Sequence, residues 1–132
     1  MWKRARHAAP ERAWADEAVR GLGQFSSQDE LLAAVSRAVG QDLVVVPTDE
    51  AVLNGALEPW PGGRLAIRVP TAASGMHARH LVCRGAARAL YNSHPTAPHD
   101  RMDYTQPIER EIEWAATHMS QTLDCAAAPR CF

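Results

Sequence analysis

Apolar and polar residues alternate most regularly over Met76–His94, where apolar or small side chains recur at steps of three and four residues. Arginines fall between or beside these positions, so one face of a helix would be buried and the other exposed. Ser74 precedes the run as a candidate N-cap, and Pro95 disfavours helical geometry in the residue before it. We therefore predict that Met76–His94 forms the central helix of the fold.

Three further segments have helical periodicity. They are predicted to span Arg12–Gly21, Asp29–Val39 and Ile108–Leu123. The second has the clearest start, because Ser27 followed three residues later by Glu30 is a capping-box pattern. The sequence therefore predicts two helices before the central one and one after it.

Between the second helix and the central one, the pattern favours strands. Leu43–Val46 is a continuous apolar run, which indicates a buried strand before a turn at Pro47–Glu50. Val52–Pro59 and Arg64–Val69 flank a Pro-Gly-Gly turn at residues 61–63 and are predicted to pair. The expected order is α-α-β-β-β-α-α, an α+β fold in which helices cover a small, mainly antiparallel three-stranded meander.

The length and composition are those expected of one domain. The chain has 132 residues, of which 46% are hydrophobic and 22% charged, as in an ordinary globular protein. We expect the domain to span residues 1–124, with residues 125–132 as a frayed tail. The connector His94–Gln106 has no sustained period and is expected to be a surface loop over one end of the central helix.

Charge and cysteine content narrow the possible partners and the compartment. Fourteen basic and fifteen acidic residues give a formal net charge of −1, which offers no general attraction for nucleic acid or an anionic membrane. No apolar segment approaches the length of a membrane span, so we expect a cytoplasmic protein that contacts neither nucleic acid nor membrane directly. Cys83, Cys125 and Cys131 are odd in number and lack the C-x2-C spacing of zinc sites, which indicates free thiols.

The central helix also contains a sequence that is similar to a known family. Residues 77–90, HARHLVCRGAARAL, resemble the active-site helix of the ImmA/IrrE-type metallopeptidase-like proteins, especially their short actinobacterial ParH-like members. In that family the helix carries H-E-x-x-H, in which two histidines bind zinc and the glutamate activates the zinc-bound water. The corresponding positions here hold Arg84, Gly85 and Arg88, which can neither bind zinc nor act as the base. The resemblance implies a zincin-like central helix without the chemistry of the peptidase.

The resemblance extends to about Met119 and implies further site residues. His77 and His80 match the leading histidines of the family helix. Glu109 sits where a later helix of the family supplies the third zinc ligand, and Glu113 follows it by four residues. The resemblance thus implies that these side chains border one cleft.

The same correspondence predicts an ion pair. In the family these positions converge on one metal, so we predict that Arg84 or Arg88 pairs with Glu109, or failing that with Glu113. A guanidinium would then occupy the place of the lost cation. The alternative is that Glu109 simply faces water.

Three functions of different classes follow from these observations. The first, which the resemblance favours, is a catalytically degenerate relative that uses no cofactor and acts by binding a protein, with a helix-turn-helix regulator as the suspected partner. The second is an enzyme of another chemistry, or a binder of a small anionic ligand, that uses the former zinc cleft. The third is a metal-binding protein with relocated ligands. Candidate ligand-binding residues are His77, His80, Arg84, Arg88, Glu109 and Glu113, and candidate metal ligands are His77, His80, His94, His99 and Glu109.

If the second function holds, the candidate catalytic residues are Cys83, His80 and Glu109. The nearby Arg84 would favour a thiolate at Cys83, and His80 lies close to it on the same helix. The alternative is that Cys83 is a buried structural cysteine.

Overall fold

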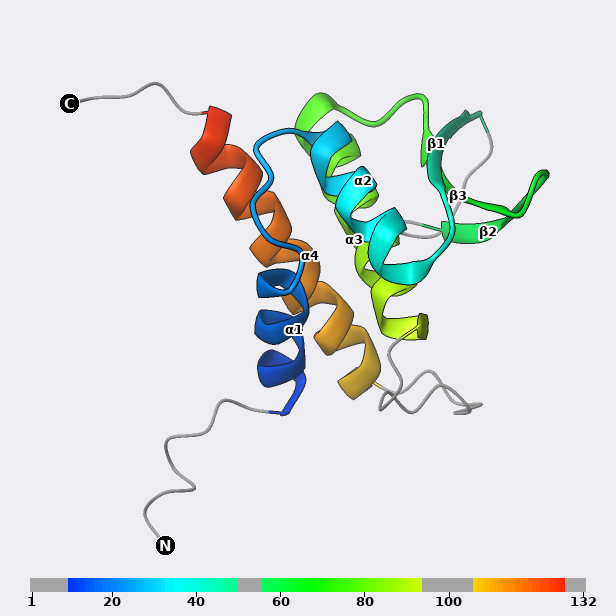
Figure 1. Cartoon of the computed structure of the whole chain (residues 1–132). Coiled ribbons are helices and arrows are strands. Elements are labelled where there is room, and N and C mark those ends of the chain that lie inside the picture. The colour runs from blue at the N-terminus through cyan, green and yellow to red at the C-terminus, as the bar shows by residue number, and fades with distance from the viewer. Residues whose placement is uncertain (1–9, 50–55, 94–105, 128–132) are drawn as a thin grey trace, which may run out of the picture.

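A computed structural model describes residues 10–49, 56–93 and 106–127, and within them the chain forms four helices and a three-stranded sheet (Figure 1). The elements in chain order are α1 Pro10–Arg20, α2 Gln28–Val39, β1 Leu43–Thr48, β2 Ala56–Trp60, β3 Arg64–Pro70, α3 Gly75–Ser93 and α4 Gln106–Ala127. The predicted order α-α-β-β-β-α-α and the α+β class are confirmed.

Several boundaries differ from the predictions by a few residues, and two of the differences change the extent of the sheet or of the domain. β1 continues through Pro47 to Thr48, where a turn was predicted, because it stays paired with β3 as far as Thr48 opposite Pro70. α4 continues to Ala127, past residue 124, where the domain was expected to end. Residues 128–132 of the expected tail, residues 52–55 of the expected second strand and residues 94–105 of the expected loop lie outside the described residues.

The predicted meander is wrong, because β3 rather than β2 is the central strand. β1 pairs with β3 in parallel, with Val45 opposite Ile67, and β2 pairs with β3 antiparallel, with Leu57 opposite Ile67. The physical reason lies in Pro47 of β1 and Pro59 of β2, since proline has no N–H to donate to a ladder and suits an edge strand. The sheet is therefore mixed, with a proline inside each edge strand, whereas the proline of the central strand, Pro70, is its last residue.

The predicted turn between β2 and β3 is confirmed. Trp60 pairs with Arg64 across it, and Gly62 and Gly63 have φ angles of 84° and 72°, a left-handed conformation that favours glycine. The Arg64 Nε donates a hydrogen bond of 2.8 Å to the carbonyl of Pro61. This bond connects the last residue of the turn region to its first and stabilises the turn. This hairpin fixes the register of β2 on β3.

The helix α3 is the centre of three layers (Figure 1). α2 and α3 lie against one face of the sheet, and α4 and α1 lie on the side of α3 away from the sheet. The buried residues of α3 are Leu81, Val82, Cys83, Gly85, Ala86, Ala87, Ala89, Leu90 and Tyr91. Most of them are small, so sheet and helices can approach α3 closely from both sides, as expected of a central helix.

The close contact between α3 and β3 depends on Gly85. A Cβ at this position would lie 2.5 Å from Cγ2 and 2.8 Å from Cγ1 of Ile67, whose side chain is fully buried. The helix can therefore lie this near the central strand only because residue 85 has no side chain. With Gly85 facing the sheet, the neighbouring residues Arg84 and Arg88 are directed toward α4.

The predicted N-caps of α2 and α3 are confirmed. Ser27 Oγ accepts a hydrogen bond of 3.1 Å from the backbone N–H of Glu30, and Ser74 Oγ accepts one of 3.3 Å from that of His77. The Glu30 carboxylate reaches the N–H and hydroxyl of Ser26, one residue earlier than a capping box requires, at 2.7 and 2.9 Å. These hydrogen bonds from Ser26 lower the pKa of Glu30.

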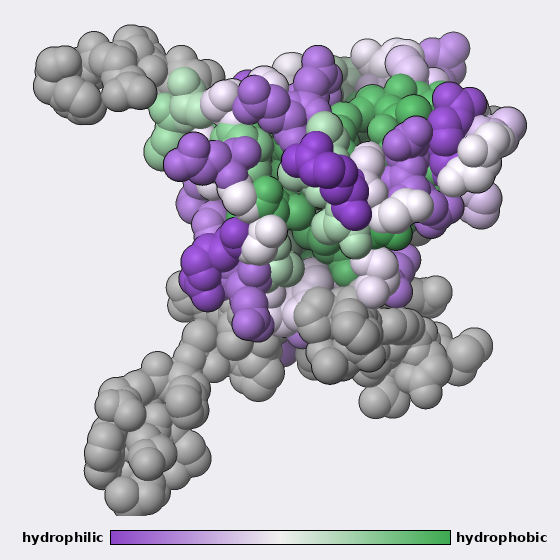
Figure 2. All heavy atoms as spheres, viewed as in Figure 1, coloured by the Kyte–Doolittle hydropathy of each residue, from purple (hydrophilic) through white to green (hydrophobic). Residues whose placement is uncertain are grey.

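The surface is of mixed character. On the face shown in Figure 2, hydrophilic and hydrophobic residues are interspersed over helices and sheet. Met76 and Trp114 are the large hydrophobic side chains that stand out as exposed among the described residues, at 82% and 39%. No helix in this part of the chain is both long enough and apolar enough to cross a membrane.

Candidate functional site

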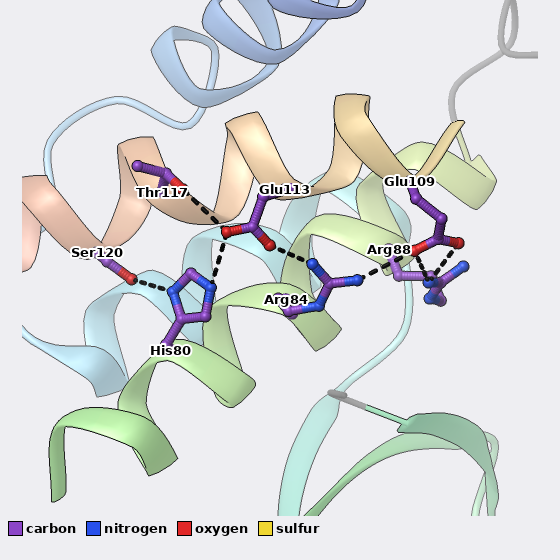
Figure 3. Close-up of polar contacts among 7 residues, drawn as sticks. All are labelled: His80, Arg84, Arg88, Glu109, Glu113, Thr117 and Ser120. Carbon is purple, nitrogen blue, oxygen red and sulfur yellow. Dashed lines mark hydrogen bonds and ion pairs between the residues drawn. The ribbon is translucent and has the colours of Figure 1, made fainter. Parts of the chain in front are cut away.

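Five side chains line the contact between α3 and α4, and we call them the charged seam: His80, Arg84 and Arg88 on α3, and Glu109 and Glu113 on α4 (Figure 3). Residues four apart lie on one face of a helix, so each helix contributes one row of side chains. The helices run in opposite directions, so the rows meet in reverse order, with His80 beside Glu113 and Arg88 beside Glu109.

Arg84 is the centre of the charged seam. Its Nη1 donates a hydrogen bond to Oε1 of Glu113, and its Nη2 donates one of 3.0 Å to Oε1 of Glu109. The side chain is only 13% exposed, and its Nε is buried without a hydrogen-bond partner among the described residues. The rigid planar fork of a guanidinium explains how one arginine bridges two carboxylates.

Arg88 completes the contact with Glu109. Its Nη2 donates to both carboxylate oxygens of Glu109, each at 3.1 Å. The predicted ion pair is confirmed, and it is more extensive than predicted, because both arginines and both glutamates take part.

The charges of the seam are balanced within it. The guanidinium groups of Arg84 and Arg88 face the carboxylates of Glu109 and Glu113, and the arginines are the more buried partners, at 13% and 23% against 36% and 46%. An anionic ligand at this place would compete with two carboxylates that already accept from the guanidinium groups. The arrangement is therefore better suited to holding α3 against α4 than to binding an anion.

Gly85, which the sequence resemblance aligns with the general base of the metallopeptidase-like family, faces the sheet and not the seam. Even a methyl group there would collide with Ile67, so a glutamate side chain has no room beside β3. Arg84, Gly85 and Arg88, the three positions that the resemblance aligns with the zinc motif, therefore offer neither a metal ligand nor a base.

The structure brings only some of the candidate metal ligands together. Within the described ranges, no group of three or more His, Cys, Asp or Glu side chains is placed to hold a metal ion. Both ring nitrogens of His80 contact other side chains, those of Ser120 and Glu113. His94 and His99 lie outside the described residues.

Two polar residues at the His80 end of the seam were not predicted. His80 Nε2 lies 3.1 Å from Oε2 of Glu113, and His80 Nδ1 lies 3.3 Å from Oγ of Ser120. Thr117 Oγ1 donates a hydrogen bond of 3.3 Å to the same Oε2 of Glu113. The signal for Thr117 and Ser120 was their spacing of four and seven residues from Glu113, which places all three on one face of a helix.

A groove with a volume of 410 Å³ opens beside this end of the seam. It is lined by Met76, His77, Arg79, His80, Ser120 and Asp124. Arg79 Nη1 donates a hydrogen bond of 2.5 Å to Oδ1 of Asp124, which joins α3 to α4 across the groove. His77, a candidate ligand from the sequence, is thus part of the groove wall.

Cys83 is fully buried, with 0% of its surface exposed. Burial raises the pKa of its thiol, and the smaller opposing effects of a hydrogen bond with Ser120 and the charge of Arg79 do not reverse this. Because the thiolate is the nucleophile, this environment favours a structural role for Cys83 over a catalytic one.

Alkylation should separate Cys83 from the exposed Cys125. We expect iodoacetamide at neutral pH to modify Cys125 at least about 10²-fold faster, because Cys83 must first be exposed by local opening of the fold. Peptide mapping by mass spectrometry measures the two rates, and the same reaction in urea should modify both residues. Equal rates in the native protein would contradict the burial of Cys83.

The positions that resemble the metallopeptidase-like family lie on α3 and α4, and Arg84, Arg88 and Glu109 meet in the charged seam. Comparison of the chain with protein-family models, with curated proteins and with solved structures found no match. The resemblance therefore rests on the sequence alone, mainly on residues of these two helices.

Proposed function

We propose that this domain is a catalytically degenerate relative of the ImmA/IrrE-type metallopeptidase-like proteins and acts as a protein-binding, regulatory module. One observation carries the proposal. Arg84 and Arg88, at the two positions where the family binds zinc, both donate hydrogen bonds to Glu109, at the position of the third ligand. The guanidinium groups supply positive charge where the family has a metal cation, so the domain keeps the charge balance of such a site without its hydrolytic chemistry.

The proposed partner is a regulator with a helix-turn-helix domain. The family resemblance supports this choice, since such relatives are commonly linked to regulators of this kind. The formal net charge of −1 also favours contact with a protein over contact with the phosphate backbone of DNA. In this proposal the domain acts on DNA only through its partner.

Metal content tests the loss of peptidase chemistry. We expect the purified protein to hold no stoichiometric zinc and to show no chelator-sensitive peptidase activity, because a guanidinium has no lone pair to offer a metal. Elemental analysis after dialysis, together with a peptidase assay with and without EDTA, measures both. About one tightly held zinc ion per chain would contradict the proposal.

Partner binding is tested with purified proteins. Titration calorimetry of the domain against individual helix-turn-helix regulators should find one that binds, and the domain alone should leave DNA unshifted in gels at physiological salt. A specific duplex shifted by the isolated domain would contradict the division of roles between domain and partner.

A further inference from the structure

A hydrogen-bonded chain joins Ser120, His80 and Glu113 (Figure 3). The contacts of His80 in this chain are not needed to balance the charges of the seam. The Ser120 hydroxyl lies 3.3 Å from one ring nitrogen of His80, and the Glu113 carboxylate lies 3.1 Å from the other. A hydroxyl within hydrogen-bond reach of a base, with the base oriented by an acid, is the arrangement by which serine hydrolases activate their nucleophile.

The contacts of Glu113 hold its carboxylate in place beside His80. Arg84 donates to one oxygen of Glu113 and Thr117 to the other, so the carboxylate is fixed and accepts hydrogen bonds only. It therefore favours a proton on Nε2 of His80, so that Nδ1 can accept the proton of the Ser120 hydroxyl when this hydroxyl turns from the Cys83 thiol toward the ring.

The same hydroxyl and imidazole line the 410 Å³ groove described above, which lies within the size range of small-molecule sites. Met76, whose side chain is 82% exposed, supplies an apolar wall. Arg79, also in the wall, has five N–H donors, and one of the two on Nη1 is engaged with Asp124. A guanidinium placed there can stabilise negative charge on the oxygen of a carbonyl held in the groove.

We propose that this groove is a site of acyl transfer to Ser120, and that its substrate is a small carboxylic ester with a short apolar acyl group. Ser120 is the nucleophile, His80 the general base, and Arg79 the group that stabilises the oxyanion. Glu113 is a positioning residue that acts through His80. This activity uses neither the zinc chemistry that the domain is proposed to lack nor the proposed partner, so either proposal can be disproved without the other.

The reaction proceeds in two balanced steps. In the first, Ser120 Oγ forms a bond to the carbonyl carbon, its proton moves to Nδ1 of His80, and the ester C–O bond breaks as that proton passes to the leaving alcohol. In the second, water attacks the acyl-serine and gives a proton to His80, which passes it to the departing Ser120 Oγ. The products are one alcohol and one carboxylic acid.

The test uses the full chain with two probes, p-nitrophenyl butyrate and a fluorophosphonate. We expect ester hydrolysis and a single covalent adduct that peptide mapping places on Ser120. Ser120→Ala should lose the adduct and reduce hydrolysis to the level of free imidazole, and His80→Gln should slow adduct formation by about 10²–10⁴-fold. Ser93→Ala is the matched control, because it removes a serine hydroxyl from α3 thirteen residues after His80. It should leave adduct formation and ester hydrolysis unchanged.

Two further variants separate catalysis from structure. Adding imidazole to His80→Ala should restore labelling of Ser120, which a purely structural role of His80 would not produce. Glu113→Gln should lower kcat with KM nearly unchanged, because Glu113 orients the base and does not touch the ester. The proposal is overturned if the wild-type protein forms no adduct at Ser120, or if Ser120→Ala hydrolyses the ester as fast as the wild type.

Discussion

Arg84→Ala is expected to lower the free energy of unfolding by about 2–3 kcal/mol. The substitution removes hydrogen bonds to both Glu109 and Glu113 and leaves Arg88 as the only guanidinium of the seam. A fully buried ion pair would cost about 3–5 kcal/mol on loss of one partner. We expect less here because Glu109 and Glu113 are 36% and 46% exposed, so water screens them. Urea unfolding at neutral pH measures the change.

Arg79→Ala is the matched control. It removes an arginine from the same helix whose partner, Asp124, is 58% exposed, so we expect a loss within about 1 kcal/mol. Adding Glu113→Ala to Arg84→Ala should recover part of the stability, because it removes a carboxylate left with fewer donors. If Arg84→Ala is no more costly than Arg79→Ala, the seam does not hold α3 against α4.

Gly85→Ala is expected to destabilise the fold by about 2–3 kcal/mol, although the same change in an open helix position stabilises by about 1 kcal/mol. The added Cβ would lie 2.5 Å from a methyl carbon of Ile67, and the β-branched side chain on the central strand has little freedom to move away. α3 must then shift away from β3. Thermal and urea unfolding should both report the loss.

Gly75→Ala provides the control for helix propensity, because no atom lies within 4 Å of the position that its Cβ would take. It should leave stability unchanged or slightly raised. Ile67→Ala is expected to lower the free energy of unfolding by itself. The double variant Gly85→Ala/Ile67→Ala should lose less stability than the sum of the two single losses. Simple additivity would mean that the contact between Gly85 and Ile67 does not limit the approach of α3 to the sheet.

The helices could be predicted from the sequence because their signals are local. The N-caps Ser27 and Ser74 and the left-handed Gly40, with a φ of 79°, mark helix ends through contacts within a few residues. The apolar periodicity of α3 reflects its position between the sheet and the other helices, which bury most of its surface. The order of the helices along the chain could therefore be predicted, and with it the α+β class of the fold.

The sheet was only partly predictable. Adjacent strands in sequence suggested a meander, but Pro47 and Pro59 carried the information that β1 and β2 are edge strands. That reasoning places β3 in the centre. The parallel direction of β1 depends on the path between the strands, which no residue pattern within β1 specifies.

The candidate site was also only partly predictable from the sequence. Spacing along each helix predicted that Arg84 and Arg88 form one row, and the family resemblance predicted that Glu109 faces them. The role of Ser120 could not be predicted, because its contact with His80 depends on the rotation of α4 against α3. Helix spacing gives neighbours on one helix and leaves the pairing between helices open.

The central claim is that Arg84 and Arg88 take the place of a metal cation bound through Glu109, and a zinc titration of Arg84→His/Arg88→His tests it most directly. If residues 84, 88 and 109 converge as the zinc ligands of the family do, the double variant has two imidazoles four residues apart that face a carboxylate. These three side chains are a complete set of protein ligands for zinc. We predict that the folded double variant binds one zinc ion per chain, that the wild type binds none, and that adding Glu109→Ala abolishes binding. A folded double variant that takes up no more zinc than the wild type would contradict the claim.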